Sequence, residues 1–149
     1  MWQRIQTVFL AAAIIVLLVS LVQPIWSIRT DVNETVLTPF YLLRDTSYQY
    51  FPFTLTAILS IASITLAATS IMRYRNRILQ IKLGALNSLV LVGVVGSSVY
   101  FATQLISEFH GGGYGLGMYL PLIAVLCNLA ANFFIRKDER LVRSSERLR

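Results

Sequence analysis

The sequence predicts an all-α membrane protein: a bundle of four transmembrane helices with a small β-sheet or hairpin in the first external connection and a short cytoplasmic C-terminal helix. The 149 residues are 56% hydrophobic and only 13% charged, whereas soluble domains carry about 25% charged residues. The apolar residues gather in four runs, each long enough to cross a bilayer core as a helix. The length suits one domain over residues 1–149.

The first apolar run, residues 5–26, contains no charged residue. It is longer than the apolar region of a typical signal peptide, and no small-x-small cleavage pattern follows it. We therefore expect an uncleaved first span.

The connection after this span, from residue 27 to about residue 52, predicts a small sheet. Apolar and polar residues alternate from Trp26 to Asn33, which is the period of a strand. Residues 35–37 could return antiparallel to it, and residues 40–43 and 48–51 flank a polar corner and could form a second pair. We expect two to four strands lying on the membrane, with Trp26, Ile28 and Val32 protected and Arg29 and Asp31 exposed.

The second and third spans, about residues 53–72 and 83–106, carry polar residues suited to contacts between helices. The second span is rich in Ser and Thr, whose hydroxyls bond to carbonyls of their own helix or to a neighbouring helix; a polar ligand channel is the alternative. In the third span, Gly93 and Ser97 have the small-xxx-small spacing that permits close helix approach. Asn87 is expected to seek a partner on another helix.

The connection over residues 107–118 contains five glycines. Glycine-rich phosphate-binding loops follow a strand within a βαβ unit, and no such unit precedes this loop. We expect a flexible glycine turn, with a gating loop as the alternative.

The fourth span, about residues 119–135, places Asn128 and Asn132 four residues apart on one helix face. We expect both to bond to another span, and Cys127 to be a packing residue. The candidates for helix packing are therefore Asn87, Gly93, Ser97, Asn128 and Asn132. The tail, residues 136–149, is expected to form a separate short helix.

Basic residues predict the orientation. Of the 13 Lys and Arg residues, eleven fall on the side of the two termini and the second connection, and only Arg29 and Arg44 fall on the other side. The positive-inside rule then places both termini in the cytoplasm. Anionic headgroups, or an unknown protein partner, are the expected ligands of this basic face, and nucleic acid is not. The candidates for the face are Arg73, Arg75, Arg77, Arg140, Arg143 and Arg147.

The acidic residues Asp138 and Glu139 stand where the tail leaves the fourth span. One hypothesis is that one of them pairs with the arginines of the second connection and holds the tail helix across the inner face. The alternative is a solvated helix held only by lipid headgroups, because exposed ion pairs are weak.

Both ends of the chain resemble one known family. The opening residues 1–7, MWQRIQT, and the closing residues 135–149, IRKDERLVRSSERLR, resemble the domain-of-unknown-function family 4293. The pair Ser145-Glu146 departs from the family form, which has Asp before the last Arg, but keeps the acidic charge. The resemblance covers the whole chain. It implies a small four-span protein of a bacterial inner membrane, as in Bacteroidetes, and it implies no activity.

No Asp, Glu, His, Lys or Arg lies inside any span, and Cys127 stands alone, whereas catalysis or ion-coupled transport in a membrane normally uses such residues. We therefore expect no enzyme, no cofactor and no metal site. Two functions stay open: a scaffold or assembly partner that uses the outer sheet or the basic inner face, and a protein that binds, senses or transports a lipid or another apolar molecule among the helices.

Overall fold

The computed structural model describes residues 2–29, 34–73 and 76–146. Four long helices dominate it: α1 (Trp2–Val22), α2 (Leu55–Met72), α3 (Arg77–Phe109) and α4 (Leu116–Glu146). Each is long and apolar enough to cross a membrane. By length and composition the helices therefore suggest a multi-pass membrane protein.

The ends of the helices follow from local chemistry. Helix α1 ends at Val22, just before Pro24, which lacks a backbone N–H and disfavours helix in the residue before it. Helix α3 begins after Asn76, whose side chain accepts a hydrogen bond of 3.1 Å from the backbone N–H of Leu79. It ends at Phe109, and the next residue, His110, caps it in the left-handed conformation with φ 54°.

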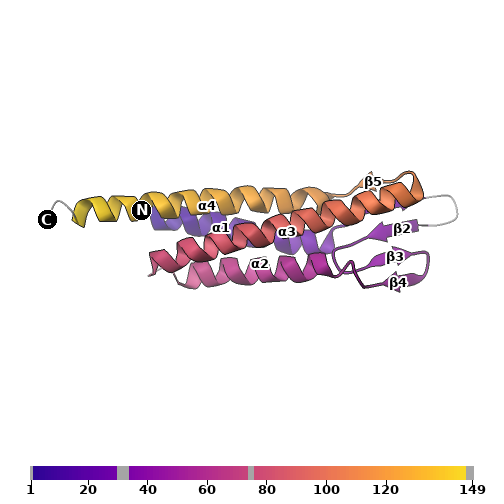
Figure 1. Cartoon of the computed structure of the whole chain (residues 1–149), viewed down its shortest axis with the longest axis horizontal. Coiled ribbons are helices and arrows are strands. Elements are labelled where there is room, and N and C mark those ends of the chain that lie inside the picture. The colour runs from indigo at the N-terminus through magenta and orange to yellow at the C-terminus, as the bar shows by residue number, and fades with distance from the viewer. Residues whose placement is uncertain (1, 30–33, 74–75, 147–149) are drawn as a thin grey trace.

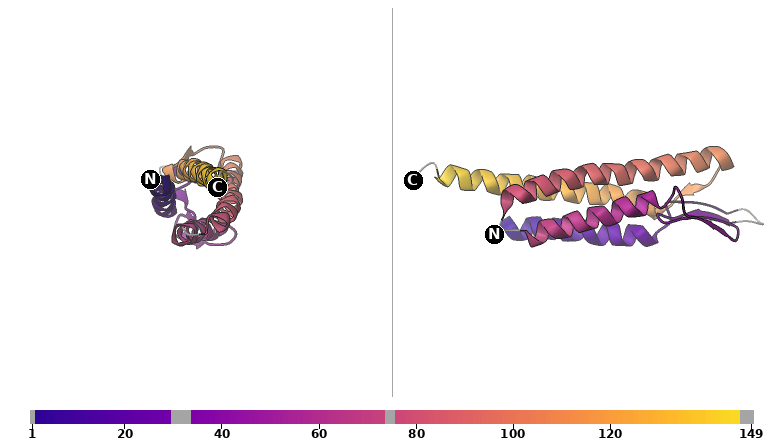
Figure 2. Two further views of the ribbon diagram at one scale, coloured as in Figure 1. Left: turned by 90° about the vertical axis from the view of Figure 1, so that its left-hand side faces the viewer. Right: turned by 60° about the horizontal axis from the view of Figure 1, so that its bottom comes forward.

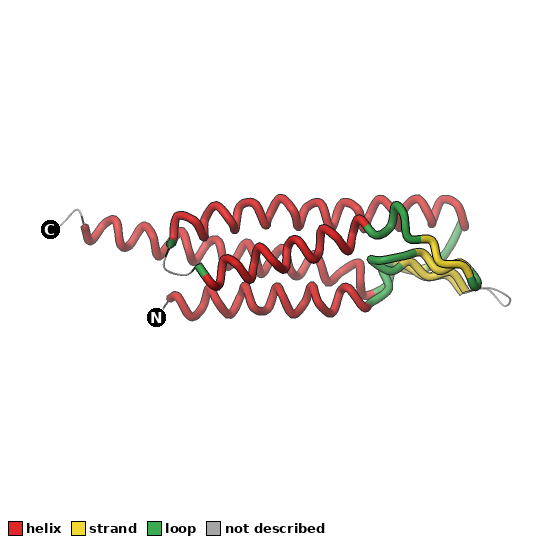
Figure 3. Tube along the Cα trace, turned by 90° about the horizontal axis from the view of Figure 1, so that it is seen from below, coloured by secondary structure: helices red, strands yellow, loops and turns green. Residues whose placement is uncertain are grey.

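The helices lie side by side, and each contacts two neighbours. Helix α1 packs between α4 and α2, and α3 packs between α2 and α4, which gives the ring seen end-on in Figure 2. Both termini lie at one end of the molecule, and α4 projects beyond the other helices there (Figure 1). The sheet lies at the opposite end (Figure 3).

The sheet has five short antiparallel strands in the order β4-β3-β2-β1-β5. Four of them connect α1 to α2: β1 (Trp26–Arg29), β2 (Glu34–Leu37), β3 (Leu42–Arg44) and β4 (Ser47–Gln49). The fifth, β5 (Gly113–Tyr114), comes from the connection between α3 and α4 and pairs with β1. The two connections therefore form one outer layer.

The C-terminal part of α3 supports the sheet. With 33 residues the helix is about 50 Å long, and its last turns pack on residues of the strands. Trp26 is fully buried at this contact and Ile28 is half-buried, whereas Arg29 is exposed. The buried residues of this outer core are Ile25, Trp26, Leu37, Leu42, Phe53, Phe101, Ala102 and Leu105.

Two hydrogen bonds between α2 and α3 show over what length the two helices lie side by side. Thr56 Oγ1 donates to Ser97 Oγ over 3.1 Å at the sheet end, and Gln80 Nε2 donates to the Ser70 carbonyl over 2.8 Å at the other end. The α3 residues of these bonds are about 25 Å apart along the helix axis. The part of α3 after Ser97 therefore extends past the start of α2, beside the sheet.

The predicted four apolar helices and the small antiparallel sheet between the first two are confirmed, and several boundaries are corrected. Helix α1 stops at Val22, and Trp26 belongs to β1, not to the first span. Helix α3 exceeds the predicted 83–106 at both ends. The expected helix of the tail is present as far as Glu146, but it is the continuation of α4 and not a separate element. The glycine-rich connection contains a strand and is not merely a turn. The predicted alternation at residues 30–33 lies outside the described residues.

Candidate functional site

A network of amide and hydroxyl groups joins α2, α3 and α4 in the interior. Ser63 Oγ of α2 donates to Asn87 Oδ1 of α3 over 2.7 Å, and Asn87 Nδ2 donates to Asn128 Oδ1 of α4 over 3.0 Å. All three side chains are buried. These bonds connect three helices through one asparagine, and an apolar surrounding strengthens such bonds.

The network continues along the α3–α4 contact toward the chain termini. Asn128 Nδ2 donates to Ser88 Oγ over 2.8 Å, and Asn132 Nδ2 donates to the Gly84 carbonyl over 3.0 Å. Gly84 permits this approach because a Cβ there would lie 1.8 Å from Asn132 Oδ1. Gly84 and Ser88 are thus the small pair at which α3 meets α4.

The structure places Gly93 and Ser97 differently from the sequence expectation. A Cβ on Gly93 would meet a methyl group of Leu59 at 3.4 Å, so a side chain faces Gly93, not the backbone of a second helix. Ser97 accepts a hydrogen bond from Thr56 and donates to the Val94 carbonyl over 3.0 Å. Gly93 and Ser97 thus both lie at the contact with α2, but the tighter approach is that of Gly84 and Ser88, which have the same spacing.

The network offers no reactive group. Its members are amides and hydroxyls that bond mostly to one another, and none of them titrates near neutral pH. Among the described residues, no cluster of three or more His, Cys, Asp or Glu could hold a metal ion. Cys127 is half-buried and packs against the cluster of Ala13, Leu17, Leu91 and Ala124. The network therefore joins helices to one another, and the charged side chains described below lie at the two ends of the molecule.

At the end with the termini, one ion pair joins α3 to α4. Arg77 Nη1 lies 3.4 Å from Asp138 Oδ2, and both side chains are mostly buried. One acid of the tail thus pairs with an arginine of the second connection, as one of the two hypotheses expected. The tail nevertheless does not cross the inner face, because α4 runs straight outward (Figure 1).

The other basic candidates are only partly described. Arg73 is exposed after α2 and Arg140 is exposed on α4. Arg143 lies within α4, but its side chain falls outside the described part, and Arg75 and Arg147 lie wholly outside it. The structure therefore brings Arg77 into a contact and places Arg73 and Arg140 on the surface.

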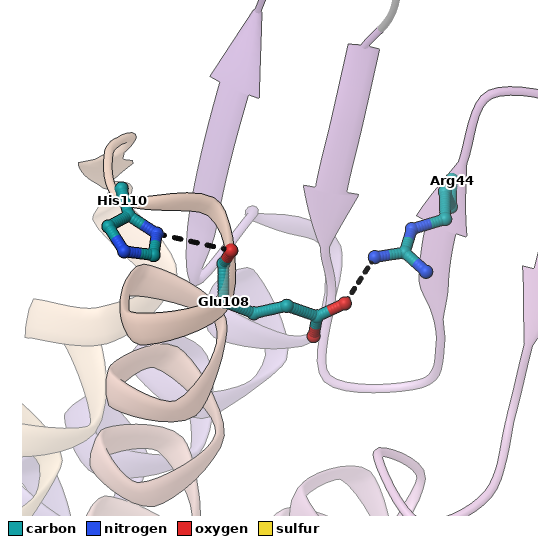
Figure 4. Close-up of polar contacts among 3 residues, drawn as sticks. All are labelled: Arg44, Glu108 and His110. Atoms are coloured by element: carbon teal, nitrogen blue, oxygen red, sulfur yellow. Dashed lines mark hydrogen bonds and ion pairs between the residues drawn. The ribbon is translucent and has the colours of Figure 1, made fainter.

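At the sheet end, both arginines bond to carboxylates. Arg44 donates to Glu108 over 2.5 Å, and its guanidinium lies 4.7 Å from the centre of the Phe109 ring. Figure 4 shows Glu108 reaching from the end of α3 toward Arg44 of β3, whereas the His110 ring lies on the other side of the helix. Arg29 bonds to Glu34 over 2.8 Å. The positive charge of this end is thus neutralised within the chain.

The glycine-rich connection is built around Trp26. Gly112 has φ +95°, and a Cβ there would lie 2.4 Å from the Trp26 ring. Gly115 and Gly117 approach the Pro24 carbonyl, where a Cβ would lie 2.2 and 2.8 Å from its oxygen. These glycines allow the connection to cover the start of the sheet, a contact that the sequence pattern did not reveal.

The strand β4 forms one edge of the sheet and is exposed along its whole length. Tyr48 and Tyr50 lie beside Tyr41, with ring centres 5.2 and 6.0 Å from it. The exposed fractions of Tyr48 and Tyr50 are 57% and 60%. This end therefore presents aromatic side chains next to an unpaired strand edge.

Beside this edge, α3 carries an open groove of about 850 Å³. Its lining residues are Gly96, Val99, Tyr100, Thr103, Gln104, Ser107 and Glu108. Because Glu108 also binds Arg44, the groove adjoins the β3–β4 hairpin.

Comparison with known proteins gives a family without an assigned activity. No curated protein matches the chain. The model of the family DUF4293, a domain of unknown function, matches residues 2–148 and thus nearly the whole chain, so the chain belongs to the DUF4293 family.

Proposed function

We propose that this protein is a non-enzymatic scaffold of a bacterial inner membrane, which crosses the membrane four times and binds a protein partner through its outer sheet. In this arrangement both termini and the basic residues face the cytoplasm. The sheet and the end of α3 face outward.

The distribution of polarity supports membrane insertion. The buried faces of the helices carry Ser63, Asn87 and Asn128, whereas large apolar side chains point outward. Examples are Val8, Leu89 and Leu126, whose exposed fractions are 65%, 71% and 66%. Helices whose outward faces are mainly apolar, with amide groups at their mutual contacts, suit a lipid solvent.

The length of α3 agrees with this placement. The segment between Gln80 and Ser97 extends for about 25 Å, close to the roughly 30 Å of a hydrocarbon core. After it, Thr103, Gln104, Ser107 and Glu108 are all exposed, as suits a helix end in water. The positive-inside rule supports the orientation.

The β4 edge carries the scaffold proposal. In a two-residue hairpin the residues beside the turn, Arg44 and Ser47, form a hydrogen-bonded pair, so the next residue, Tyr48, directs its N–H and C=O away from β3. An exposed edge of this kind can accept a strand from a partner. The neighbouring tyrosines and the α3 groove would add side-chain contacts.

Storage of an apolar ligand among the helices has less support. The amides and hydroxyls on which it would depend bond mostly to one another, and the 850 Å³ groove is on the outside of α3. We therefore prefer the scaffold.

Site-specific photo-crosslinking in living cells tests the scaffold. A photoreactive residue at Tyr48 or at Gln104 should capture the same protein, and one at Leu126, which faces outward from α4, should not. Tyr48→Pro should abolish capture from Gln104, because it removes the free N–H, whereas Tyr48→Ala keeps the N–H and serves as its control. Absence of any protein adduct at both outer positions would contradict the proposal.

A further inference from the structure

Two cavities adjoin on the α3–α4 surface near the chain termini. One, of about 350 Å³, is lined by Ala85, Ser88, Leu129, Asn132, Phe133 and Arg136. The other, of about 390 Å³, is lined by Phe133, Arg136, Lys137 and Arg140. They share Phe133 and Arg136 and therefore lie next to each other, and we call the two together the inner groove.

The inner groove changes its chemistry along its length. Leu129, Phe133, Arg136 and Arg140 follow one another at intervals of three or four residues and so share one face of α4. The face is apolar at Leu129 and Phe133 and basic at Arg136 and Arg140. A molecule bound along this face would need an apolar part beside Leu129 and Phe133 and an anionic part beside Arg136 and Arg140.

Two arginines of the basic part, Arg136 and Arg140, lack an internal counterion. Among the side chains that the structure describes, which are those of residues 5–29, 34–73 and 76–141, Arg136 and Arg140 form no ion pair with a carboxylate, whereas Arg29, Arg44 and Arg77 each do. Both side chains are exposed at the surface. An anion bound there would meet at least two uncompensated guanidinium groups, which bind phosphate oxygens well.

We propose that the inner groove binds a phospholipid with an anionic headgroup. The phosphate lies among Arg136, Lys137 and Arg140, and an acyl chain follows Phe133 and Leu129 toward Ala85. A basic pocket between helices at the cytoplasmic side is a known type of site for such headgroups. The site rests on the proposed membrane placement, which puts the basic half at the headgroups and the apolar half at the acyl chains.

The apolar half of the groove distinguishes a lipid from a free anion, because an ion pair with the arginines needs only the basic half. A free phosphate would contact only the basic half. A lipid would use both halves, so its binding should depend on Phe133 as well as on the arginines.

Native mass spectrometry of the full-length protein in detergent tests the site, with phosphatidylglycerol and phosphatidylcholine of identical chains as the probes. We expect stronger retention of phosphatidylglycerol. Arg136→Gln with Arg140→Gln should weaken it by about thirtyfold and leave phosphatidylcholine unchanged. Arg73→Gln with Lys82→Gln removes the same charge at the same end of the molecule but outside the groove, and should retain wild-type binding.

Two further measurements distinguish a lipid headgroup from free phosphate as the anion that binds. Phe133→Gln should weaken phosphatidylglycerol binding, and inorganic phosphate should not displace the lipid. The proposal would be overturned if the Arg136→Gln/Arg140→Gln variant and the Arg73→Gln/Lys82→Gln variant lost the same amount of phosphatidylglycerol binding. Displacement of the lipid by inorganic phosphate would also overturn it. A thermal unfolding midpoint near that of the wild type verifies that each variant is folded. The readout needs no protein partner, so a negative result here would leave the scaffold proposal intact, and failed cross-linking would leave the lipid site intact.

Discussion

Arg77 and Asp138 face each other across the α3–α4 contact, with 3.4 Å between Nη1 and Oδ2. The pair joins the first turn of α3 to the point where α4 leaves the other helices. Its side chains are only 27% and 18% exposed, so water screens the pair less than a surface pair. It therefore fixes where α4 begins to project.

A double-mutant cycle should detect this pair. Arg77→Gln and Asp138→Asn are each expected to destabilise the protein, and the double variant should show a coupling of about 1 kcal/mol. Amide hydrogen exchange should also accelerate in residues 136–146 of either single variant. Arg73→Gln is the matched control, and equal acceleration in that variant would show that the pair is not what holds α4.

Asn128 should contribute to the packing of α3 against α4. Asn128→Ala removes the bonds to Asn87 and Ser88 and is expected to cost about 1 kcal/mol, as measured for other bonds between membrane helices. Unfolding in mixed detergent micelles measures the change. Leu126→Ala, at an outward position on the same helix, should have little effect; if both variants lose the same stability, the network does not hold the helices.

The glycines of α3 should differ sharply in their tolerance of a side chain. A Cβ on Gly84 would lie 1.8 Å from Asn132 Oδ1, whereas a Cβ on Gly93 would lie 3.4 Å from a methyl group of Leu59 and a Cβ on Gly96 would meet nothing within 4 Å. We expect Gly84→Ala to destabilise the protein by about 1–3 kcal/mol, and Gly96→Ala to be neutral.

The loss of stability in Gly93→Ala should lie between the losses in Gly84→Ala and Gly96→Ala. Gly93→Leu, which needs far more room, should disrupt the contact with α2. Thermal unfolding in detergent ranks the variants, and an equal effect at Gly84 and Gly96 would contradict the close approach at Gly84.

Reporter fusions should reveal the topology of the chain. Fusions after Lys82 and Arg149 are expected to read as cytoplasmic, and those after Asp45 and Gly113 as external. Paired phosphatase and fluorescent reporters at each position give opposite signals and so control for expression. A cytoplasmic reading after Asp45 would rule out the four-span arrangement.

The sequence revealed the helices because a long apolar run satisfies its backbone hydrogen bonds within itself only as a helix. It did not reveal the continuity of α4, because the change from Ile135 to Arg136 alters the polarity of the side chains and not the conformation of the backbone; no Gly or Pro stands there to end a helix. It also did not single out the closest helix contact, since Gly93 and Gly84 both have a serine four residues later. Spacing identifies such a pair but does not say which helix face meets a neighbour.

The glycine-rich connection was misjudged for a different reason. A strand is recognised by the alternation of its side chains, and a segment with few side chains shows none. Its conformation is determined by Trp26, almost ninety residues earlier in the sequence. Among the functional candidates, Tyr48 of β4 lies in a segment that the sequence predicted as a strand, whereas the inner groove depends on how α3 and α4 pack.

The pairing of β5 with β1 has a consequence for the order in which the molecule is made. Synthesis delivers β1 to β4 first, and at that stage one edge of β1 is open and Trp26 lacks its cover. The missing strand arrives only after the whole of α3, at the start of the last helix. A chain interrupted before Gly112 would thus leave one edge of β1 unpaired and the Trp26 indole without its glycine cover, whereas the finished chain covers both; the sheet is therefore complete only when the last connection has been made.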